Sequence, residues 1–383
     1  MDMNDLYIRC KEQVKKKVLL NAAYTDEAVC IMILDVIAEQ HKKEWIPLCE
    51  RICIGRKIFN SLRGLDILQP ILEDDAVTDI MVNGPNHIYY EKNGQMMRSN
   101  EHFESEKRLE DLIQQIVGSV NRSVNEANPI VDARLNDGSR VHVVLPPVAL
   151  NGPVLTIRRF RKQPITIEEL IRWGTLDENT ACFLKQAVEE KKNIFVCGGT
   201  ASGKTTLLNV LSNFIPAYER IITIEDAAEL RLAQLENVVT LETRNGNAEG
   251  KGQISMRELI KASLRMNPDR IIVGEVRGGE ALDMLQAMNT GHEGSLSTGH
   301  ANSCKDMLMR IETMALMGAE IPLEAIRQQM ASAIDLLIYV EKKAGGKRQL
   351  SEIRRVLGYR DGEVQTRIVM RLENDQIVWE KQD

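Results

Sequence analysis

A glycine-rich segment at residues 198–206 constrains the fold of this chain more than any other feature. Its sequence, Gly-Gly-Thr-Ala-Ser-Gly-Lys-Thr-Thr, fits the phosphate-binding loop pattern of Gly, any four residues, Gly, Lys and then Ser or Thr. An apolar run at 193–197 precedes it and a helix-like run follows from Thr205, which is the strand, loop and helix order of that motif. Glycines let successive backbone N–H groups and a helix N-terminus face one anion. We therefore expect an α/β fold with a phosphate site at this loop.

The loop residues have distinct expected tasks at a bound nucleotide, which we expect to be ATP. Lys204 is predicted to reach the β- and γ-phosphates, and the hydroxyl of Thr205 to bind Mg²⁺. The other predicted nucleotide-binding positions are Gly198, Gly199, Thr200, Ala201, Ser202, Gly203 and Thr206. The alternative is a glycine-rich turn before an ordinary helix.

The composition is that of a folded globular chain. Its 383 residues suggest two or three domains, with 43% hydrophobic and 27% charged residues. A net charge of −6 and only 4% aromatic residues argue against a nucleic-acid partner. No apolar run reaches the roughly 18 residues of a membrane-spanning helix. Seven scattered cysteines suggest reduced thiols in a cytosol, and for Cys49 and Cys53 we expect buried thiols rather than a zinc site.

Three parts are predicted to follow one another along the chain. Residues 1–64 have apolar positions at helical spacing and a capping Thr25, which predicts a three-helix bundle. Residues 65–160 combine recurrent turn signals, short strand-like runs and a helix at about 106–121, which predicts a small α/β domain. A linker at 161–165 precedes residues 166–383, where strands and helices alternate as in a mostly parallel sheet.

Carboxylates follow two apolar runs of this last part. Glu275 comes just after the run at 270–273, at the strand end where α/β sheets bind ligands. It is expected to orient the attacking water or to hold hydrated Mg²⁺. Gly274 stands where an Asp usually precedes such a glutamate, so other groups must complete the metal site. The candidates follow the run at 221–224, where a solvated acidic loop is the alternative: Glu225, Asp226 and Glu229.

The segment at 289–303 is polar and glycine-rich, and we expect it to be a loop. It holds His292 and His300, two of the six histidines of the chain. A single histidine is usually structural, but two in such a segment suggest sensors of a γ-phosphate. Ser303 and Asp306 are expected to begin the next helix as a capping box.

Taken together, these motifs resemble one family, the CpaF-type ATPases of the tight-adherence (Tad or Flp) pilus systems, within the type II and type IV secretion ATPase superfamily. The resemblance covers roughly residues 55–345. The matching segments are 72–84, 132–141, 146–147, 155–160, the phosphate loop, 224–230, 241–244, 274–277, 287–292 and 299–303. In the family these include an acidic box at 224–230, an atypical Walker B sequence at 274–277, in which Gly274 is usual, and a His box with both histidines.

The resemblance implies a RecA-like P-loop NTPase motor domain, preceded by the small α/β domain and the helical bundle. It implies a ring of six subunits, each hydrolysing ATP with Mg²⁺ between its two larger domains. The implied catalytic residues are Glu275, Glu225, Glu229, Arg134, Arg140, Arg158 and His300. Arg277 and His292 are implied to bind nucleotide, and Thr205, Asp226 and Glu275 to bind the metal. Arg134, Arg140, Arg158 and Arg159 match the positions from which basic residues reach the phosphates in the family. A solvated basic surface is the alternative for all four.

The same resemblance implies a motor that powers pilin assembly or secretion. The implied partners are five further copies of the chain and platform proteins of the inner membrane, and the implied location is the cytoplasmic face of that membrane. The chain itself is expected to have no membrane span and no nucleic-acid partner. Two alternatives stay open: a RecA-type nucleic-acid translocase and a nucleotide-gated scaffold with little turnover.

Overall fold

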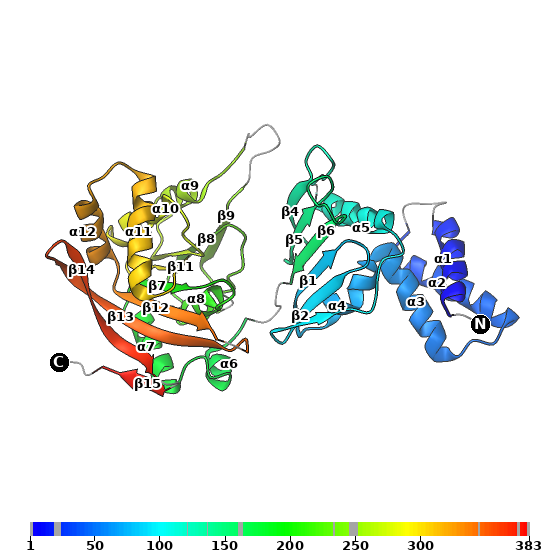
Figure 1. Ribbon diagram of the computed structural model, residues 1–383, viewed down its shortest axis with the longest axis horizontal. Helices are drawn as coiled ribbons and strands as arrows, with labels where there is room; N and C mark the ends of the chain where they lie inside the picture. The colour runs from blue at the N-terminus through cyan, green and yellow to red at the C-terminus, as the bar shows by residue number, and fades with distance from the viewer. Residues whose placement is uncertain are drawn as a thin grey trace. The chain divides into compact units, whose positions relative to one another are not determined.

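The computed structural model describes residues 3–18, 24–120, 122–135, 137–159, 164–232, 234–244, 252–343, 345–373 and 376–380. The chain forms two compact units, residues 1–162 and 163–383 (Figure 1). The predicted linker at 161–165 falls mostly outside the described residues. No helix in the described ranges combines the length and the apolar character that crossing a membrane requires.

The first unit begins with the predicted three-helix bundle. Its helices are α1 (Met3–Val18), α2 (Asp26–Lys43) and α3 (Leu48–Arg63). They bury a core of their own, to which each helix contributes apolar residues at helical spacing. The hydroxyl of Thr25 accepts a hydrogen bond from the backbone N–H of Ala28, so it caps α2 as predicted.

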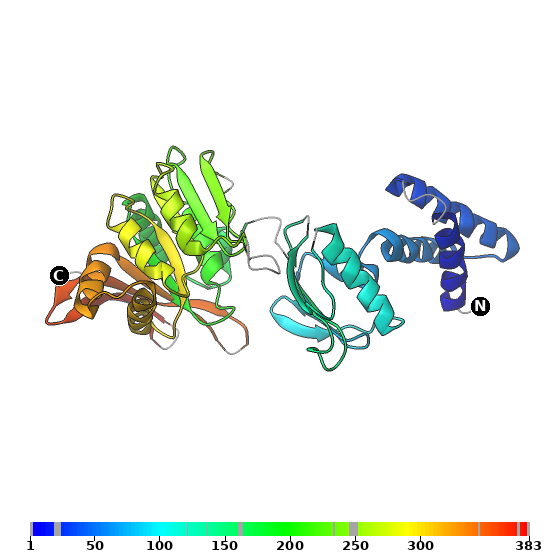
Figure 2. The same ribbon diagram turned by 90° about the horizontal axis from the view of Figure 1, so that it is seen from above.

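The rest of the first unit is a six-stranded antiparallel sheet covered by one long helix. The sheet order is β3-β2-β1-β6-β5-β4. Its strands are β1 (Val77–Asn83), β2 (Ile88–Lys92), β3 (Gln95–Arg98), β4 (Ile130–Arg134), β5 (Arg140–Val144) and β6 (Val154–Arg158). The helices are α4 (Gln69–Glu73), after a 3₁₀ turn at Asp66–Leu68, and α5 (Glu106–Ser119), whose apolar face packs on the sheet (Figure 2).

The second unit is built on a nine-stranded sheet of order β15-β14-β13-β12-β7-β11-β10-β8-β9. The strands from β12 to β9 are parallel, and the last hairpins of the chain extend the sheet antiparallel. The parallel strands are β7 (Ile194–Gly198), β8 (Ile221–Glu225), β9 (Val238–Glu242), β10 (Arg270–Val273), β11 (Leu296–His300) and β12 (Leu336–Lys342). The others are β13 (Arg348–Arg360), β14 (Glu363–Glu373) and β15 (Gln376–Trp379).

Helices cover both faces of this sheet, which gives the unit two hydrophobic cores. One core contains residues of α6 (Ile167–Arg172), α7 (Glu178–Glu189) and α8 (Lys204–Ser212). The other contains residues of α9 (Met256–Ser263), α10 (Glu280–Met288), α11 (Cys304–Gly318) and α12 (Leu323–Ala333). A parallel sheet covered on both faces is the predicted α/β fold, and it leaves the C-terminal strand ends as the place for a ligand.

A fully buried ion pair lies at the opposite, N-terminal edge of the parallel strands. Arg270, the first residue of β10, is 0% exposed and contacts Glu219 through Nε at 2.5 Å and Nη2 at 3.0 Å. Its Nη1 donates to the carbonyl oxygen of Val188 at the end of α7, at 2.6 Å. The guanidinium thus ties α7, the chain before β8 and the start of β10 together.

Replacing Arg270 with alanine is expected to lower the free energy of unfolding by about 3–5 kcal/mol, because among the described residues it leaves the buried Glu219 carboxylate with Lys191, 3.8 Å away, as its ion-pair partner. Chemical denaturation of the full chain measures this. Arg360→Ala is the control, since that arginine and its partner Asp361 are 82% and 84% exposed, and such pairs contribute only about 0–1 kcal/mol. Equal effects of the two substitutions would contradict the structural role of the buried pair.

Candidate functional site

The phosphate loop connects the end of β7 to the start of α8, as the sequence predicts. Gly198 is required by close packing: a Cβ there would lie 2.2 Å from the carbonyl oxygen of Val340 in β12. Two loop residues have left-handed backbone conformations, Ala201 with φ 56° and Gly203 with φ 97°. The hydroxyl oxygen of Ser202 is buried and has no hydrogen-bond partner among the described residues. The left-handed residues let the loop curl, so that successive backbone N–H groups can face an anion.

Lys204 lies folded back over its own loop. Its Nζ donates to the carbonyl oxygens of Gly198 at 3.1 Å and Gly199 at 2.8 Å. The side chain is 7% exposed, so the ammonium depends on such acceptors in place of water. To reach a bound phosphate, the ammonium would exchange these carbonyl oxygens for phosphate oxygens.

His300, the last residue of β11, connects this loop to Glu275. Its Nδ1 lies 3.3 Å from Nζ of Lys204, and its Nε2 lies 2.9 Å from Oε1 of Glu275. An ammonium has only protons to offer, so Nδ1 accepts from Lys204 and Nε2 carries the proton that faces Glu275. His300 is therefore neutral in this arrangement.

The surroundings of His300 favour the neutral form. Burial lowers the pKa of this imidazole most, and three nearby cations lower it further against the opposing charge of Glu275. The cations are Lys204, Arg277 and Arg310. A neutral histidine between a lysine and a glutamate can keep both charged groups in place without adding a charge of its own.

Arg277 holds the other carboxylate oxygen of Glu275. Its Nη2 and Nε lie 2.7 Å and 3.1 Å from Oε2 of Glu275, while its Nη1 lies 3.2 Å from Oδ2 of Asp226. The other oxygen of Asp226 accepts from the hydroxyl of Thr243 at 3.3 Å. The structure thus brings Lys204, His300, Glu275, Arg277 and Asp226 together at the C-terminal edge of the sheet, as the sequence motifs predict for that edge.

Glu225 has a position that the sequence does not reveal. Its buried carboxylate accepts hydrogen bonds from the backbone N–H groups of Glu229 at 2.9 Å and Leu230 at 3.2 Å. It therefore shapes the acidic loop, and its catalytic assignment, like that of Glu229 in the same loop, stays a prediction. A Cβ on Gly274 would lie 2.9 Å from Cγ of Glu225, so the glycine in place of the usual Asp leaves room for this side chain.

The expectation of a loop through 289–303 is wrong for its second half. Residues 296–300 form β11, which pairs with β7 on one side and β10 on the other. Ser297 and Thr298 are buried there, and the hydroxyl of Thr298 donates to the carbonyl oxygen of Gly274 at 2.7 Å. Gly299 lies inside this strand, where the side chain of Met307 packs against it. Small residues can therefore occupy a central strand that has no apolar run.

The two histidines of this segment lie at opposite ends of β11, and so on opposite sides of the sheet along the strand direction. His300 ends β11, whereas His292 precedes the strand and its Nδ1 lies 3.2 Å from the carbonyl oxygen of Ala287 at the end of α10. The five-residue strand between them spans about 13 Å along the sheet. The structure therefore does not bring His292 together with Lys204, and its nucleotide-binding role stays a prediction.

Three of the predicted arginines form one row across the sheet of the first unit. Arg134 of β4 pairs with Arg140 of β5, which in turn pairs with Arg158 of β6. Residues directly opposite each other in antiparallel strands share a face, with Cβ atoms about 4.5–5.5 Å apart. Like charges so placed repel one another, and Asp79 in β1 lies opposite Arg158. A row of this kind is suited to bind an anion.

Arg159 belongs to a different environment. It follows the last residue of β6, and its backbone N–H donates to the carbonyl oxygen of Thr78 at 2.8 Å. There its guanidinium donates to the carbonyl oxygen of Asp74, and its Nη2 lies 2.6 Å from Oδ1 of Asp75. Arg159 thus ties the end of β6 to the chain before β1, and only its neighbour joins the row.

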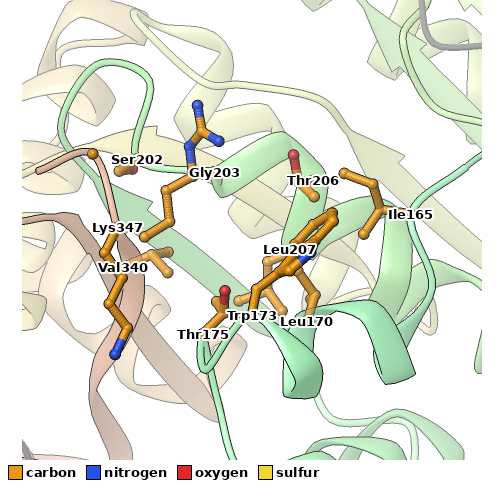
Figure 3. A pocket seen from close by; sticks show the side chains of 12 residues that line it. Ile165, Leu170, Trp173, Thr175, Ser202, Gly203, Thr206, Leu207, Val340 and Lys347 are labelled. Carbon is orange, nitrogen blue, oxygen red and sulfur yellow. The ribbon is translucent and has the colours of Figure 1, made fainter. Parts of the chain in front are cut away.

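A pocket of about 190 Å³ adjoins the phosphate loop on the α8 side. Figure 3 shows Trp173 and Leu170 of the α6 segment and Leu207 of α8 together on one side, and Lys347 on the other. Arg348 also lines the pocket, and its Nε donates to the carbonyl oxygen of Ala201 at 3.1 Å. The wall is mostly apolar with cations at the rim, which suits a flat heterocycle next to a phosphate. No sequence motif indicated this pocket.

The donors at the loop fit a magnesium nucleotide better than a metal held by the protein alone. Among the described residues, no group of three or more His, Cys, Asp and Glu side chains is arranged to hold a metal ion. Mg²⁺ at phosphate sites usually takes one or two protein oxygens and keeps the rest for phosphates and water. Thr205, Asp226 and Glu275 are oxygen donors of that kind.

Sequence comparison places this geometry in a known group. The profile of the family described as type II/IV secretion system protein matches residues 61–345. The chain belongs to this family. The matched range includes the phosphate loop, Glu275, both histidines and the arginine row.

Individual relatives match this chain in sequence over most of their own length. The conjugal transfer protein TrbB of Rhizobium radiobacter is 32% identical over 324 residues, 84% of this chain and 95% of that protein. The type IV secretion system protein PtlH of Bordetella pertussis is 36% identical over 328 residues, 78% of this chain and 94% of that protein. Among solved structures, the pilus retraction motor PilT with bound ADP is similar with a TM-score of 0.55 and 23% identity, covering 74% of this chain and 81% of that one. This structural similarity confirms the α/β fold.

Proposed function

We propose that this chain is a Mg²⁺-dependent ATPase motor that powers the assembly or secretion of a Tad/Flp-type pilus. One observation carries the proposal: Lys204 of the phosphate loop, His300 and Glu275 form a continuous series of contacts of 3.3 and 2.9 Å. A phosphate on the loop would therefore lie beside a carboxylate that is already oriented. The solved relative PilT is described as a motor with bound ADP, and TrbB and PtlH are described as transfer and secretion proteins.

In this proposal, different residues of the chain bind the phosphates, accept the proton of the attacking water and hold the metal ion. Backbone N–H groups of the loop and the ammonium of Lys204 bind the phosphates. Glu275 accepts the proton of the attacking water, while Arg277 and His300 hold its two oxygens. Thr205, Asp226 and Glu275 would hold Mg²⁺, which supplies charge neutralisation at the phosphates.

The pocket beside the loop is proposed to hold the nucleoside. It opens next to Gly203 and Thr206, at the start of α8. The indole of Trp173 offers an aromatic face for a base, and the 46% exposure of this residue leaves that face accessible. Arg348 would then lie between the base and the phosphates.

A homohexamer at the cytoplasmic face of the inner membrane, together with platform proteins of that membrane, completes the proposal. The support is the family membership and the arginine row, which belongs to a compact unit separate from that of the phosphate loop. Rings formed by head-to-tail contacts can supply such groups from a neighbouring subunit. Light scattering with a non-hydrolysable ATP analogue is expected to show six subunits, and a fully active monomer would contradict it.

Phosphate release by the purified chain tests the activity. We expect hydrolysis of ATP that requires Mg²⁺ and that Lys204→Ala abolishes, because this ammonium is the cation of the loop. Thr200→Ala is the control, since it removes a loop side chain and leaves the backbone donors. A parent chain that binds ATP but releases no phosphate would favour the scaffold alternative.

Acidification is expected to lower turnover through His300. Because the pKa of His300 is lowered from its ordinary value of 6.5, turnover should stay level above that value and fall as the pH approaches the lowered pKa. There the protonated Nδ1 no longer accepts from Lys204. The unfolded chain takes up this proton first, so folding stability should also decrease over the same interval. His300→Asn should remove this step from the pH–rate profile, and His292→Asn should keep it; an unchanged profile in His300→Asn would contradict the assignment.

A further inference from the structure

The outer face of α3 in the helical bundle has an unusual composition. Seven residues of this fully described helix are exposed, and none carries a carboxylate. They are Leu48, Cys49, Ile52, Cys53, Arg56, Lys57 and Arg63. The expectation of buried thiols at Cys49 and Cys53 is thus wrong, because both cysteines lie on the solvent side of the helix.

These residues extend an apolar surface that begins just before the helix. Trp45 is 77% exposed, and Leu48 and Ile52 are each 64% exposed. Leu48 and Ile52 are neighbours at i and i+4, with Cys49 and Cys53 beside them. We call Trp45, Leu48, Cys49, Ile52 and Cys53 the apolar strip. The bundle does not need it for folding, since the core consists of other residues.

Basic side chains lie at both ends of the apolar strip. Lys42 and Lys43, in the last turn of α2, precede Trp45, with the exposed Glu44 between Lys43 and Trp45, while Arg56 and Lys57 follow Cys53. Lys57 has Glu101 at 4.0 Å, and Arg63, farther along the helix, is held by Asp26 and by the carbonyl oxygen of Tyr24. Residues 1–64 hold 11 Lys and Arg against 9 Asp and Glu, although the whole chain has a net charge of −6.

We propose that the outer face of α3 docks the chain directly on an anionic lipid bilayer. An exposed tryptophan beside aliphatic residues, flanked by lysine and arginine, is the composition of helices that lie in a membrane interface. Each basic side chain adds attraction to anionic headgroups. The acidic remainder of the chain would be repelled by the same surface, so the charge distribution also orients the protein.

Other occupants fit this face less well. A two-fold contact with a second copy of α3 would place the same basic residues against one another. A partner helix usually enters a groove, whereas this is the convex outside of a helix. The biological role of this docking rests on the proposed function, because a motor of a secretion or pilus system must work at a membrane. The observations on α3 themselves are independent of the nucleotide site.

Flotation of the full chain with vesicles tests the inference. Vesicles of phosphatidylethanolamine with phosphatidylglycerol are compared with vesicles of phosphatidylcholine alone. We expect binding to the anionic vesicles, weaker at high salt, with a blue shift of tryptophan emission that Trp45→Phe removes. Leu48→Ser with Ile52→Ser should weaken binding more than about tenfold, and Lys43→Glu with Arg56→Glu by a similar factor.

Helix α2 offers a matched control on the same bundle. Ile31 and Leu34 are 59% and 65% exposed, but the exposed face of that helix also carries Asp26, Glu27, Asp35 and Glu39. Ile31→Ser with Leu34→Ser should therefore leave vesicle binding unchanged, and thermal melts verify that all variants fold.

Three results would overturn the inference. They are no binding of the parent chain to anionic vesicles, equal losses for the α2 and α3 pairs, and a change of oligomeric mass in the Leu48→Ser, Ile52→Ser variant, which would assign the face to a subunit contact. ATP hydrolysis without vesicles is measured for every variant. Normal hydrolysis with lost vesicle binding, or the reverse, separates a failure of this inference from a failure of the proposed function.

Discussion

Replacing Glu275 with glutamine is expected to lower the turnover of ATP by about 10²–10⁴, with nucleotide binding close to that of the parent chain. The amide keeps the shape of the side chain but cannot accept the proton of the attacking water. It also presents an N–H₂ group to Arg277, which donates to the carboxylate, or to Nε2 of His300, which lies 2.9 Å from it. Turnover should therefore fall through the lost base and the lost orientation together. Single-turnover phosphate release measures the chemical step, and equilibrium binding of a fluorescent ATP analogue measures affinity.

Two further substitutions separate these contributions. Arg277→Ala removes one holder of Glu275 and keeps the base, so its effect on turnover should be smaller than that of Glu275→Gln. Glu352→Gln is the control for a carboxylate on β13 that contacts a neighbouring arginine, Arg354, outside the site. It should leave turnover unchanged. Hydrolysis by Glu275→Gln at the parent rate would exclude Glu275 as the base.

The parts of the site that the sequence predicts are those whose constraints are local. Gly198, Gly203 and Lys204 stand at fixed spacing because one short loop must curl and then begin a helix. Glu275 follows an apolar strand directly, so its place at the C-terminal edge of the sheet could be inferred from the run before it. Helices with clear apolar periodicity, such as those of the bundle, were predictable for the same reason.

The parts that the sequence does not predict depend on pairing between distant segments. β11 is a central strand although its residues 297–299 are small or polar, because burial between β7 and β10 replaces an apolar side-chain pattern. Glu225 looks like any acid of a polar loop until the fold places backbone N–H groups around it and Gly274 beside it. The pocket at Trp173 joins α6, α8 and the β12–β13 turn, which lie far apart in the chain.

The arginine row shows the same limit, and it leads to the second prediction of large effect. In sequence, Arg158 and Arg159 are equivalent neighbours. The register of β4, β5 and β6 separates them, since Arg158 pairs with Arg140 and, through it, aligns with Arg134, whereas Arg159 contacts Asp74 and Asp75. If the row faces phosphate, an arginine there can contribute about 10³–10⁵ in rate, which corresponds to about 4–7 kcal/mol of barrier.

We therefore expect Arg140→Ala, at the centre of the row, to lower turnover per folded chain by about 10³ or more. Arg158→Ala should act in the same direction. Arg159→Ala is the matched control with the opposite pattern: it should lower the melting temperature, since it removes the contacts with Asp74 and Asp75, and leave the turnover of the folded protein near that of the parent. The assay compares the phosphate release rate per folded chain with the thermal melt of each variant.

The second unit, residues 163–383, retains Lys204, Glu275 and His300. Prepared alone, it should therefore bind nucleotide and turn it over very slowly. Parent-like turnover by that unit, or equal effects of Arg158→Ala and Arg159→Ala, would assign these arginines to the protein surface and locate catalysis wholly within the second unit.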